Sequence, residues 1–147
     1  MNPLKDFEEF INQGIVKRQS PDKSRAMDLV KESNRKFNSL LVFLNKIGLD
    51  DENANDVIED CYNIIIGLIR AKMLLVGFNS SGSGAHEAEI AYLKVLNFSV
   101  RDVEFANQLR YFRNGIMYYG KKFDKEYAEK VYHFLILVKQ KLECNNI

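Results

Sequence analysis

Hydrophobic and polar residues follow one another along this chain with the spacing of helices. Apolar residues recur every three or four positions through most of the sequence, which is typical of amphipathic helices. No stretch sustains the alternation of apolar and polar positions that a half-buried strand requires. We therefore predict an all-α fold, namely an up-and-down antiparallel bundle of four main helices with shorter ones beside them.

Capping residues and glycines place the ends of six helices. Ser20, Pro21 and Asp22 form a start signal, Asp50 or Asp51 can cap the next helix, and Ser99 can cap the fifth. The expected helices cover residues 3–13, 20–47, 51–77, 85–96, 99–120 and 125–143. The stretch 56–77 is so apolar that it should be the central, most buried helix. The stretch 79–84, NSSGSG, should be a flexible linker.

The length and composition of the chain fit one helical domain over residues 1–147. We expect a short helix and connector in 1–19 and the bundle core in 20–143. A net charge of +1 means that any nucleic-acid surface must be local, and nothing indicates DNA specificity. The most apolar run is far shorter than the roughly 20 residues of a membrane span, and the N-terminus lacks a signal sequence. We expect a cytoplasmic protein with no membrane contact.

Metal and thiol chemistry receive no support from the sequence. Cys61 and Cys144 lie far apart, and we expect both to be free thiols. No Cys, His or Asp cluster has the spacing of metal ligands, so we predict no metal and no cofactor.

One helical stretch, RYFRNGIMYYG at residues 110–120, stands out because it holds two arginines, an asparagine and three tyrosines but no acid. At about 100° per residue, one stripe of this helix is apolar and should face the core. That stripe consists of Phe105, Leu109, Phe112, Ile116 and Tyr119. The remaining stripes carry Arg, Tyr, Asn and Met, which suit a packed neighbour, a protein interface, or RNA phosphates and bases.

The pattern Arg113-Asn114-x-x-x-Tyr118, on a late bundle helix followed by one last helix, resembles the HEPN family. The order of the apolar helix, the SGSGAHEAEIAYL segment and RYFRNGIMYYG extends the resemblance over roughly residues 20–143. The family implies a helical bundle, often a dimer and often encoded beside a nucleotidyltransferase. Many members look like metal-independent ribonucleases, including toxins of toxin–antitoxin pairs, whose active site is an arginine, a polar neighbour and a histidine four to six positions on.

Carried onto this chain, the resemblance assigns Arg113, Asn114 and Tyr118 to the catalytic positions. Tyr119 is the alternative register for the histidine position. The further candidate binding residues are Arg110, Tyr111, Tyr119 and His86. His86 follows the glycine-rich linker and is either an exposed or capping side chain or a residue at the edge of the cleft.

Tyrosine in place of histidine leaves it open whether the chain is an enzyme. Histidine has a pKa near 6.5 and can both take and give a proton, whereas only about one tyrosine in a thousand is ionised at pH 7. General acid–base catalysis contributes about 10² to 10⁴ in rate, most of which the exchange could remove. Arg113 and Tyr118 also lie about 140° apart on the helix, so one cleft must be broad or built by two subunits to hold both.

Two functions remain open at this stage. The first is an RNA-binding or weakly RNA-cleaving HEPN protein, a homodimer acting with a nucleotidyltransferase-type partner. The second is a non-catalytic module that uses the Arg/Tyr/Asn face for a nucleotide, a second copy or another protein. An ion pair between Arg113 and an acid of the core would favour a structural role for the arginine, and the candidate acids are Glu59, Asp60 and Glu104.

Overall fold

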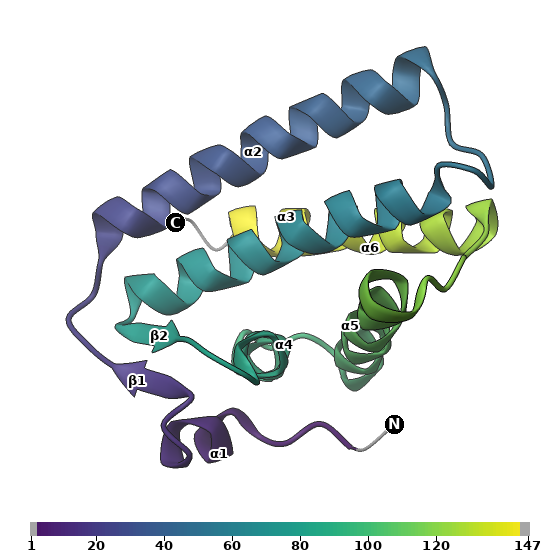
Figure 1. The fold of residues 1–147 in the computed structure, drawn as a ribbon. Coiled ribbons are helices and arrows are strands. Elements are labelled where there is room, and N and C mark those ends of the chain that lie inside the picture. Colours follow the sequence, from purple (N-terminus) through teal and green to yellow (C-terminus); the bar gives the residue numbers. More distant parts are fainter. Residues whose placement is uncertain (1–2, 145–147) are drawn as a thin grey trace.

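The computed structural model describes residues 3–144 and is mostly helical, which confirms the prediction of an all-α fold (Figure 1). It has six helices and two short strands in that range. The elements are α1 (Phe7–Asn12), β1 (Val16–Arg18), α2 (Lys23–Lys46), α3 (Ala54–Leu75), β2 (Phe78–Ser80), α4 (Ala85–Val95), α5 (Val100–Tyr119) and α6 (Lys125–Cys144).

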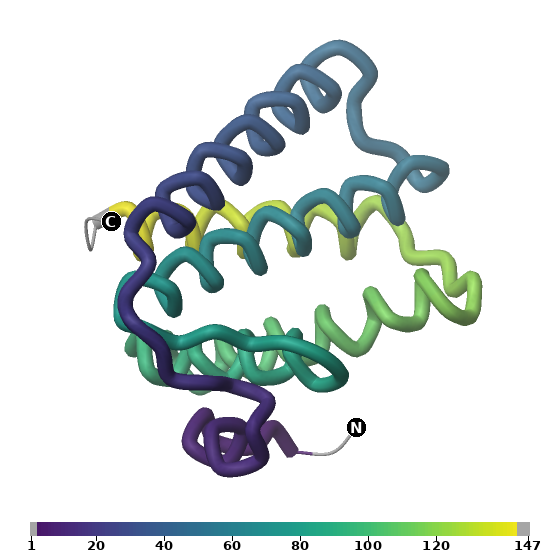
Figure 2. Tube along the Cα trace, turned by 60° about the vertical axis from the view of Figure 1, so that its left-hand side comes forward, coloured from purple at the N-terminus to yellow at the C-terminus, as the bar shows by residue number. Residues whose placement is uncertain are grey.

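Helix α3 lies at the centre of the structure. It packs on α2 and α6, and also on α4 and α5. In Figure 1, α2 and α3 run alongside each other in opposite directions, whereas α4 is seen nearly end-on and so crosses them. The starts of α3 and α6 lie at the same end, so these two packed helices run in the same direction (Figures 1 and 2). In a regular up-and-down bundle such a pair would lie on a diagonal.

The burial of α3 follows from its sequence. Fourteen of its residues are buried, including Ile58, Ile65 and Ile69, which no solvent reaches. A helix that is apolar on nearly all sides is stable only when neighbours cover every side. The prediction of a central helix is therefore confirmed, and one continuous apolar cluster extends from Phe7 to Leu142 around it.

Close packing between α2 and α3 depends on a glycine. A Cβ atom at Gly67 would lie 2.4 Å from the Oγ of Ser33, which is itself buried on α2. Glycine in a helix interior costs about 1 kcal/mol relative to alanine. Because Gly67 has no side chain, α3 can approach Ser33 of α2 closely at this position.

Two strands that the sequence analysis missed join the N-terminal segment to the connection after α3. β1 and β2 pair antiparallel, with Val16 opposite Ser80 and Arg18 opposite Phe78. Each strand is three residues long, too short to show an alternating pattern. The predicted flexible linker at 79–84 is therefore wrong for Asn79 and Ser80, which belong to β2.

Several predicted helix ends differ from the observed ones by a few residues. α1 begins at Phe7 rather than Pro3. Asp22, not Ser20, caps α2, because its carboxylate accepts from the backbone N–H of Arg25. The prediction for α5 is confirmed, since Ser99 caps it and Gly120 ends it in the left-handed conformation. Over the described residues, none of the helices has the length and apolar character needed to cross a membrane.

Candidate functional site

Arg113 lies between α5 and α3 rather than on the open surface. Its Nε and Nη2 donate to Oε1 of Glu59 at 3.1 and 3.0 Å. The guanidinium also lies over the ring of Tyr62, 5.4 Å from the ring centroid, in a cation–π arrangement. Only 15% of the arginine side chain is exposed. Of the three acids that the sequence offered as partners, Glu59 is the one used, and this contact favours a structural role for Arg113.

His86 reaches the same place from α4. Its Nδ1 lies 3.2 Å from the hydroxyl of the fully buried Tyr62. Burial, together with the nearby charges of Arg70, Arg113 and Arg110, lowers the pKa of His86 to about 4. The imidazole is therefore neutral at pH 7. His86 was expected to be either exposed or capping, or at the edge of the cleft. The structure instead places it, partly buried, against Tyr62, and it does not line the groove described below.

A second ion pair, of which only the carboxylate is fully buried, lies near the first. Glu89 of α4 is fully buried and pairs with Arg70 of α3, and it also accepts from the Oγ of Ser80 at 3.0 Å. Burial raises the pKa of Glu89, and the charge and hydrogen bonds of Arg70 oppose that effect. Arg110 of α5 completes the group and donates to Oδ1 of Asn107 at 3.2 and 3.0 Å.

We call these side chains the arginine–histidine cluster, formed by Glu59, Tyr62, Arg70, His86, Glu89, Arg110 and Arg113. Sequence reasoning named Arg110, Arg113 and His86 as site candidates but missed Tyr62, Arg70 and Glu89. Tyr62 and Arg70 belong to the apolar helix that was predicted as core, so nothing in the local pattern distinguished them. Only the packing of α3 against α4 and α5 brings them together.

The tyrosines of α5 lie elsewhere, around a separate groove of about 640 Å³. We call it the tyrosine groove, and it is lined by Tyr111, Phe112, Asn114, Gly115, Tyr118, Tyr119, Lys121 and Phe123. The lining contains no acidic residue. Tyr118 and Tyr119 have 72% and 79% of their surface exposed. The prediction that Tyr119 belongs to the core stripe is therefore wrong.

The predicted catalytic residues are thus divided between two places. Asn114 and Tyr118 line the tyrosine groove, whereas Arg113 points to Glu59 and Tyr62 and is not part of the groove lining. The sequence allowed both residues in one cleft only if that cleft was broad or built by two subunits, because they lie about 140° apart on the helix. Within one chain, the arginine and the tyrosine do not form a single cleft.

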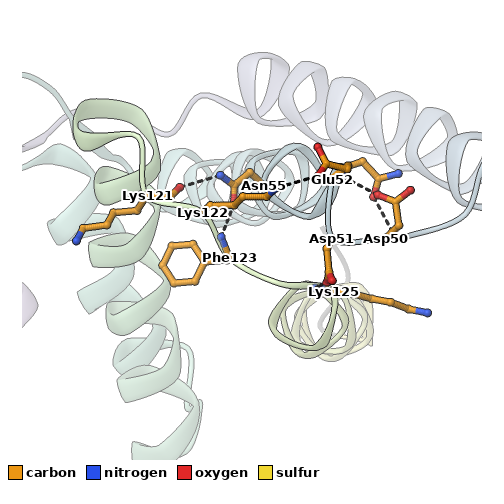
Figure 3. A network of polar contacts seen from close by, with 9 residues as sticks. Asp50, Asp51, Glu52, Asn55, Lys121, Lys122, Phe123 and Lys125 are labelled. Carbon is orange, nitrogen blue, oxygen red and sulfur yellow. Dashed lines mark hydrogen bonds and ion pairs between the residues drawn. The ribbon is translucent and has the colours of Figure 1, made fainter.

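The loop that ends the groove is positioned by Asn55 at the start of α3 (Figure 3). Its Nδ2 donates to the carbonyl of Lys121 at 2.8 Å, and its Oδ1 accepts from the N–H of Phe123 at 2.9 Å. Beside it, Lys122 pairs with Glu52 at 3.0 Å, and Asp51 accepts from the N–H of Lys125 at 2.8 Å. These contacts fix the turn between α5 and α6 on α3.

Gly115 has a local explanation. A Cβ atom at this position would lie 3.2 Å from Cγ of Lys121, and the Gly115 carbonyl accepts from the N–H of Lys121 at 3.2 Å. The close approach expected at this glycine is made by the turn of the chain itself, which folds back against the helix end.

The described residues contain no group of three or more His, Cys, Asp or Glu side chains arranged to hold a metal ion. Cys61 is a free thiol inside the core, where burial raises its pKa to about 12 and keeps it protonated. The side chain of Cys144 lies outside the described residues.

Comparison of the chain with protein-family models, with curated proteins and with solved structures gave no match to any of them. The likeness to the HEPN family therefore rests on the motif and the order of the segments in the sequence.

Proposed function

We propose that this chain is a HEPN-type RNA-binding protein that uses the tyrosine groove to hold single-stranded RNA and has little or no ribonuclease activity. The observation that carries the proposal is the strong exposure of Tyr118 and Tyr119 beside Asn114 and Lys121, in a groove without acidic residues. Exposed tyrosine rings stack on bases, the amide can hydrogen-bond base edges, and lysine attracts phosphate.

Weak catalysis follows from two features. Tyrosine holds the position of the histidine that active members of the family use, so the chain lacks the usual general acid–base group at this position. Arg113 is already engaged by Glu59 and is mostly shielded from solvent. A substrate phosphate would have to displace Glu59 before Arg113 could stabilise charge on it.

RNA binding can be tested by fluorescence anisotropy with a labelled single-stranded oligonucleotide. We expect Tyr118→Ala combined with Tyr119→Ala to weaken binding about tenfold or more, because stacking on each base contributes about 1–3 kcal/mol. The matched variants Tyr118→Phe and Tyr119→Phe keep the rings and should bind nearly as well. If the wild type does not bind single-stranded RNA, the proposal is wrong.

Catalysis is tested separately, by incubating RNA with the purified wild type and with Arg113→Ala in the presence of EDTA. We expect neither to cut above the level of a mock purification. Cleavage by the wild type that disappears in Arg113→Ala would show an active site and would contradict the proposed lack of activity.

The second candidate function is a protein interface, favoured by Met117, which precedes the groove residue Tyr118 in α5 and has 51% of its surface exposed. Met and Tyr are enriched at such contacts. A homodimer through α5, or a nucleotidyltransferase-type partner, would cover this face. Analytical ultracentrifugation of the wild type and of Met117→Lys tests the first case: a dimer that the substitution dissociates supports it.

A further inference from the structure

Another groove lies at the start of α5, at the opposite end of this helix from the tyrosine groove. Its volume of about 540 Å³ falls within the roughly 300–1,000 Å³ that is typical of small-molecule sites. In Figure 1 the N-terminal segment runs beneath α4 and α5 on its way to α1, and it forms one wall of the groove. We call this site the N-terminal groove. Its apolar lining consists of Pro3, Leu4, Phe98, Val100 and Val103.

The turn between α4 and α5 brings Phe98 to the groove. After the last turn of α4, Asn97 adopts a left-handed backbone with a φ of 65°, which asparagine tolerates better than most residues do. Ser99 then caps α5, so Val100 and Val103 of its first turn line the same groove as Phe98. Val100 is 74% exposed. A ligand with an apolar part would therefore find uncovered apolar surface here.

Asn107 supplies a polar donor among these apolar side chains. Only 5% of the residue is exposed, yet it lines the groove. Its Oδ1 accepts from Nε and Nη2 of Arg110, which fixes the orientation of the amide. Its Nδ2 has no hydrogen-bond partner among the described residues and is not sealed from solvent. Because a cation donates to the amide oxygen, the amide is polarised and Nδ2 becomes a stronger donor.

Lys94 lines the same groove and is a cation that a ligand can recruit. Its ammonium pairs with Asp6 of the N-terminal segment at 3.1 Å, and the two side chains are 42% and 76% exposed. An ion pair this exposed contributes little to stability, because water and salt screen it. Lys94 can therefore exchange Asp6 for an anionic group of a ligand. Lys141 adds positive charge nearby, since its Nζ lies 4.5 Å from the ring centroid of Phe98.

We propose that the N-terminal groove binds a monocarboxylate with an apolar tail, of the size of a medium-chain fatty acid. The tail contacts the apolar lining, one carboxylate oxygen accepts from Nδ2 of Asn107, and Lys94 balances the negative charge. A carboxylate suits this site because hydrogen bonds to a charged acceptor are about twice as strong as neutral ones. The proposal does not depend on the proposed RNA function, since the N-terminal groove and the tyrosine groove share no residue.

The experiment is a titration of the full chain with sodium octanoate, followed by NMR at concentrations below those at which octanoate forms micelles. The reporters are the side-chain amide of Asn107 and the methyl groups of Leu4, Val100 and Val103. We expect these signals to move together and to saturate. Octanol, which has the same tail without the charge, should bind about five- to tenfold more weakly, because hydrogen bonds to charged groups contribute more.

Three results would overturn the proposal. The first is that the shifts never saturate or spread over the exposed surface, which would mean unspecific contact. The second is equal binding of octanoate and octanol, because the groove would then recognise the tail alone. The third is tighter binding of octylamine than of octanoate, because Glu104, a carboxylate on the groove lining, would then decide the charge of the ligand.

Variants of the lining sharpen the test. Asn107→Asp can still accept from Arg110 but cannot donate to a ligand, so it should weaken octanoate binding about tenfold or more. Val100→Asp introduces a like charge at an exposed position and should also weaken binding. Glu104→Gln removes a charge that opposes the carboxylate and should strengthen binding several-fold. Tyr118→Ala belongs to the tyrosine groove and should leave octanoate binding unchanged.

Circular dichroism identifies any variant that fails to fold. If Asn107→Asp unfolds, Val100→Asp decides the outcome, since its position makes little contact with the core. Octanoate binding that stays unchanged in the folded variants of Asn107 and Val100 would place the ligand elsewhere and would refute the site.

Discussion

The guanidinium of Arg113 and the carboxylate of Glu59 join α5 to α3 through two hydrogen bonds to a single oxygen, at 3.1 and 3.0 Å. Both side chains are mostly shielded, with 15% and 23% of their surface exposed. The arginine that the family resemblance assigns to a catalytic position thus holds two helices together. Its substitution changes the stability of the fold as well as any function, and experiments on it must separate the two.

We expect Arg113→Ala to lower the free energy of unfolding by about 1–3 kcal/mol, because it leaves the Glu59 carboxylate shielded and without a cation. Urea unfolding followed by circular dichroism measures the change. Lys122→Ala is the matched control, since Lys122 pairs with Glu52 at 3.0 Å in an exposed position and should contribute less than about 1 kcal/mol. Equal losses in the two variants would contradict a stabilising role for the Arg113 pair.

Acid should destabilise the protein through His86. Its pKa is about 4 in the folded chain and near 6.5 in an unfolded one, so the unfolded state binds the extra proton between these values. The contribution of the neutral His86 to the free energy of unfolding is therefore complete above about pH 6.5, and it is lost as the pH falls toward 4. Because His86 is only half-buried, we expect a loss on the order of 1–2 kcal/mol.

The contribution of His86 is isolated by comparing variants. Burial raises the pKa of Glu89, which gives that carboxyl the opposite pH dependence, so the wild-type curve is a sum. His86→Gln should show a weaker loss of stability between pH 7 and 5 than the wild type. His133→Gln, at an exposed position, should behave like the wild type. If all three proteins showed the same pH dependence, the pKa of His86 would not be lowered in the folded chain.

The contact between Gly67 and Ser33 predicts a rescue. Gly67→Ala alone should destabilise the protein by about 1–2 kcal/mol, because the new methyl group meets the Ser33 hydroxyl. Adding Ser33→Ala removes that oxygen, and the double variant should recover most of the loss, aided by the higher helix propensity of alanine. Thermal unfolding of the two single variants and the double variant gives the coupling energy. Additive effects would mean that α2 and α3 do not meet as described.

Asn55 predicts a local effect at the end of α5. Asn55→Ala removes the partners of the Lys121 carbonyl and the Phe123 N–H, so the Phe123 amide should exchange with solvent deuterium faster. Asn55→Asp retains the acceptor for Phe123 and should preserve more of its protection. Amides in the middle of α3 should be unchanged in both variants. Uniformly faster exchange would indicate global destabilisation instead.

The sequence predicted the helical class and the central helix because apolar periodicity measures burial directly. Most of the predicted inward stripe of α5 is confirmed, since Leu109 is buried and Phe105 and Ile116 pack against the core. The stripe is wrong at Tyr119, because a helical wheel ranks positions by apolarity alone. Ala106 and Leu109 do face the core, but the same side also buries Asn107 and holds Arg110 and Arg113, which have polar partners. A sequence pattern cannot show that an arginine will find its carboxylate on another helix.

The aromatic end of α5 illustrates the same limit. Phe112 is covered by Phe123 of the following turn and by Tyr127 of α6. The ring centroids of these two residues lie 4.9 and 5.4 Å from that of Phe112. Tyr119 lies on the same predicted stripe, yet it is 79% exposed at the last position of the helix. Periodicity treats both positions alike, and only the path of the chain after Gly120 distinguishes them.

The pairing of β1 with β2 has a consequence for the order in which the chain assembles. The ladder joins Val16 to Ser80, so it closes a large loop that contains the whole α2–α3 hairpin. Closing a long disordered loop costs configurational entropy, and that cost falls once the intervening segment has become compact. We therefore expect the six residues of the ladder to align only after α2 and α3 have docked.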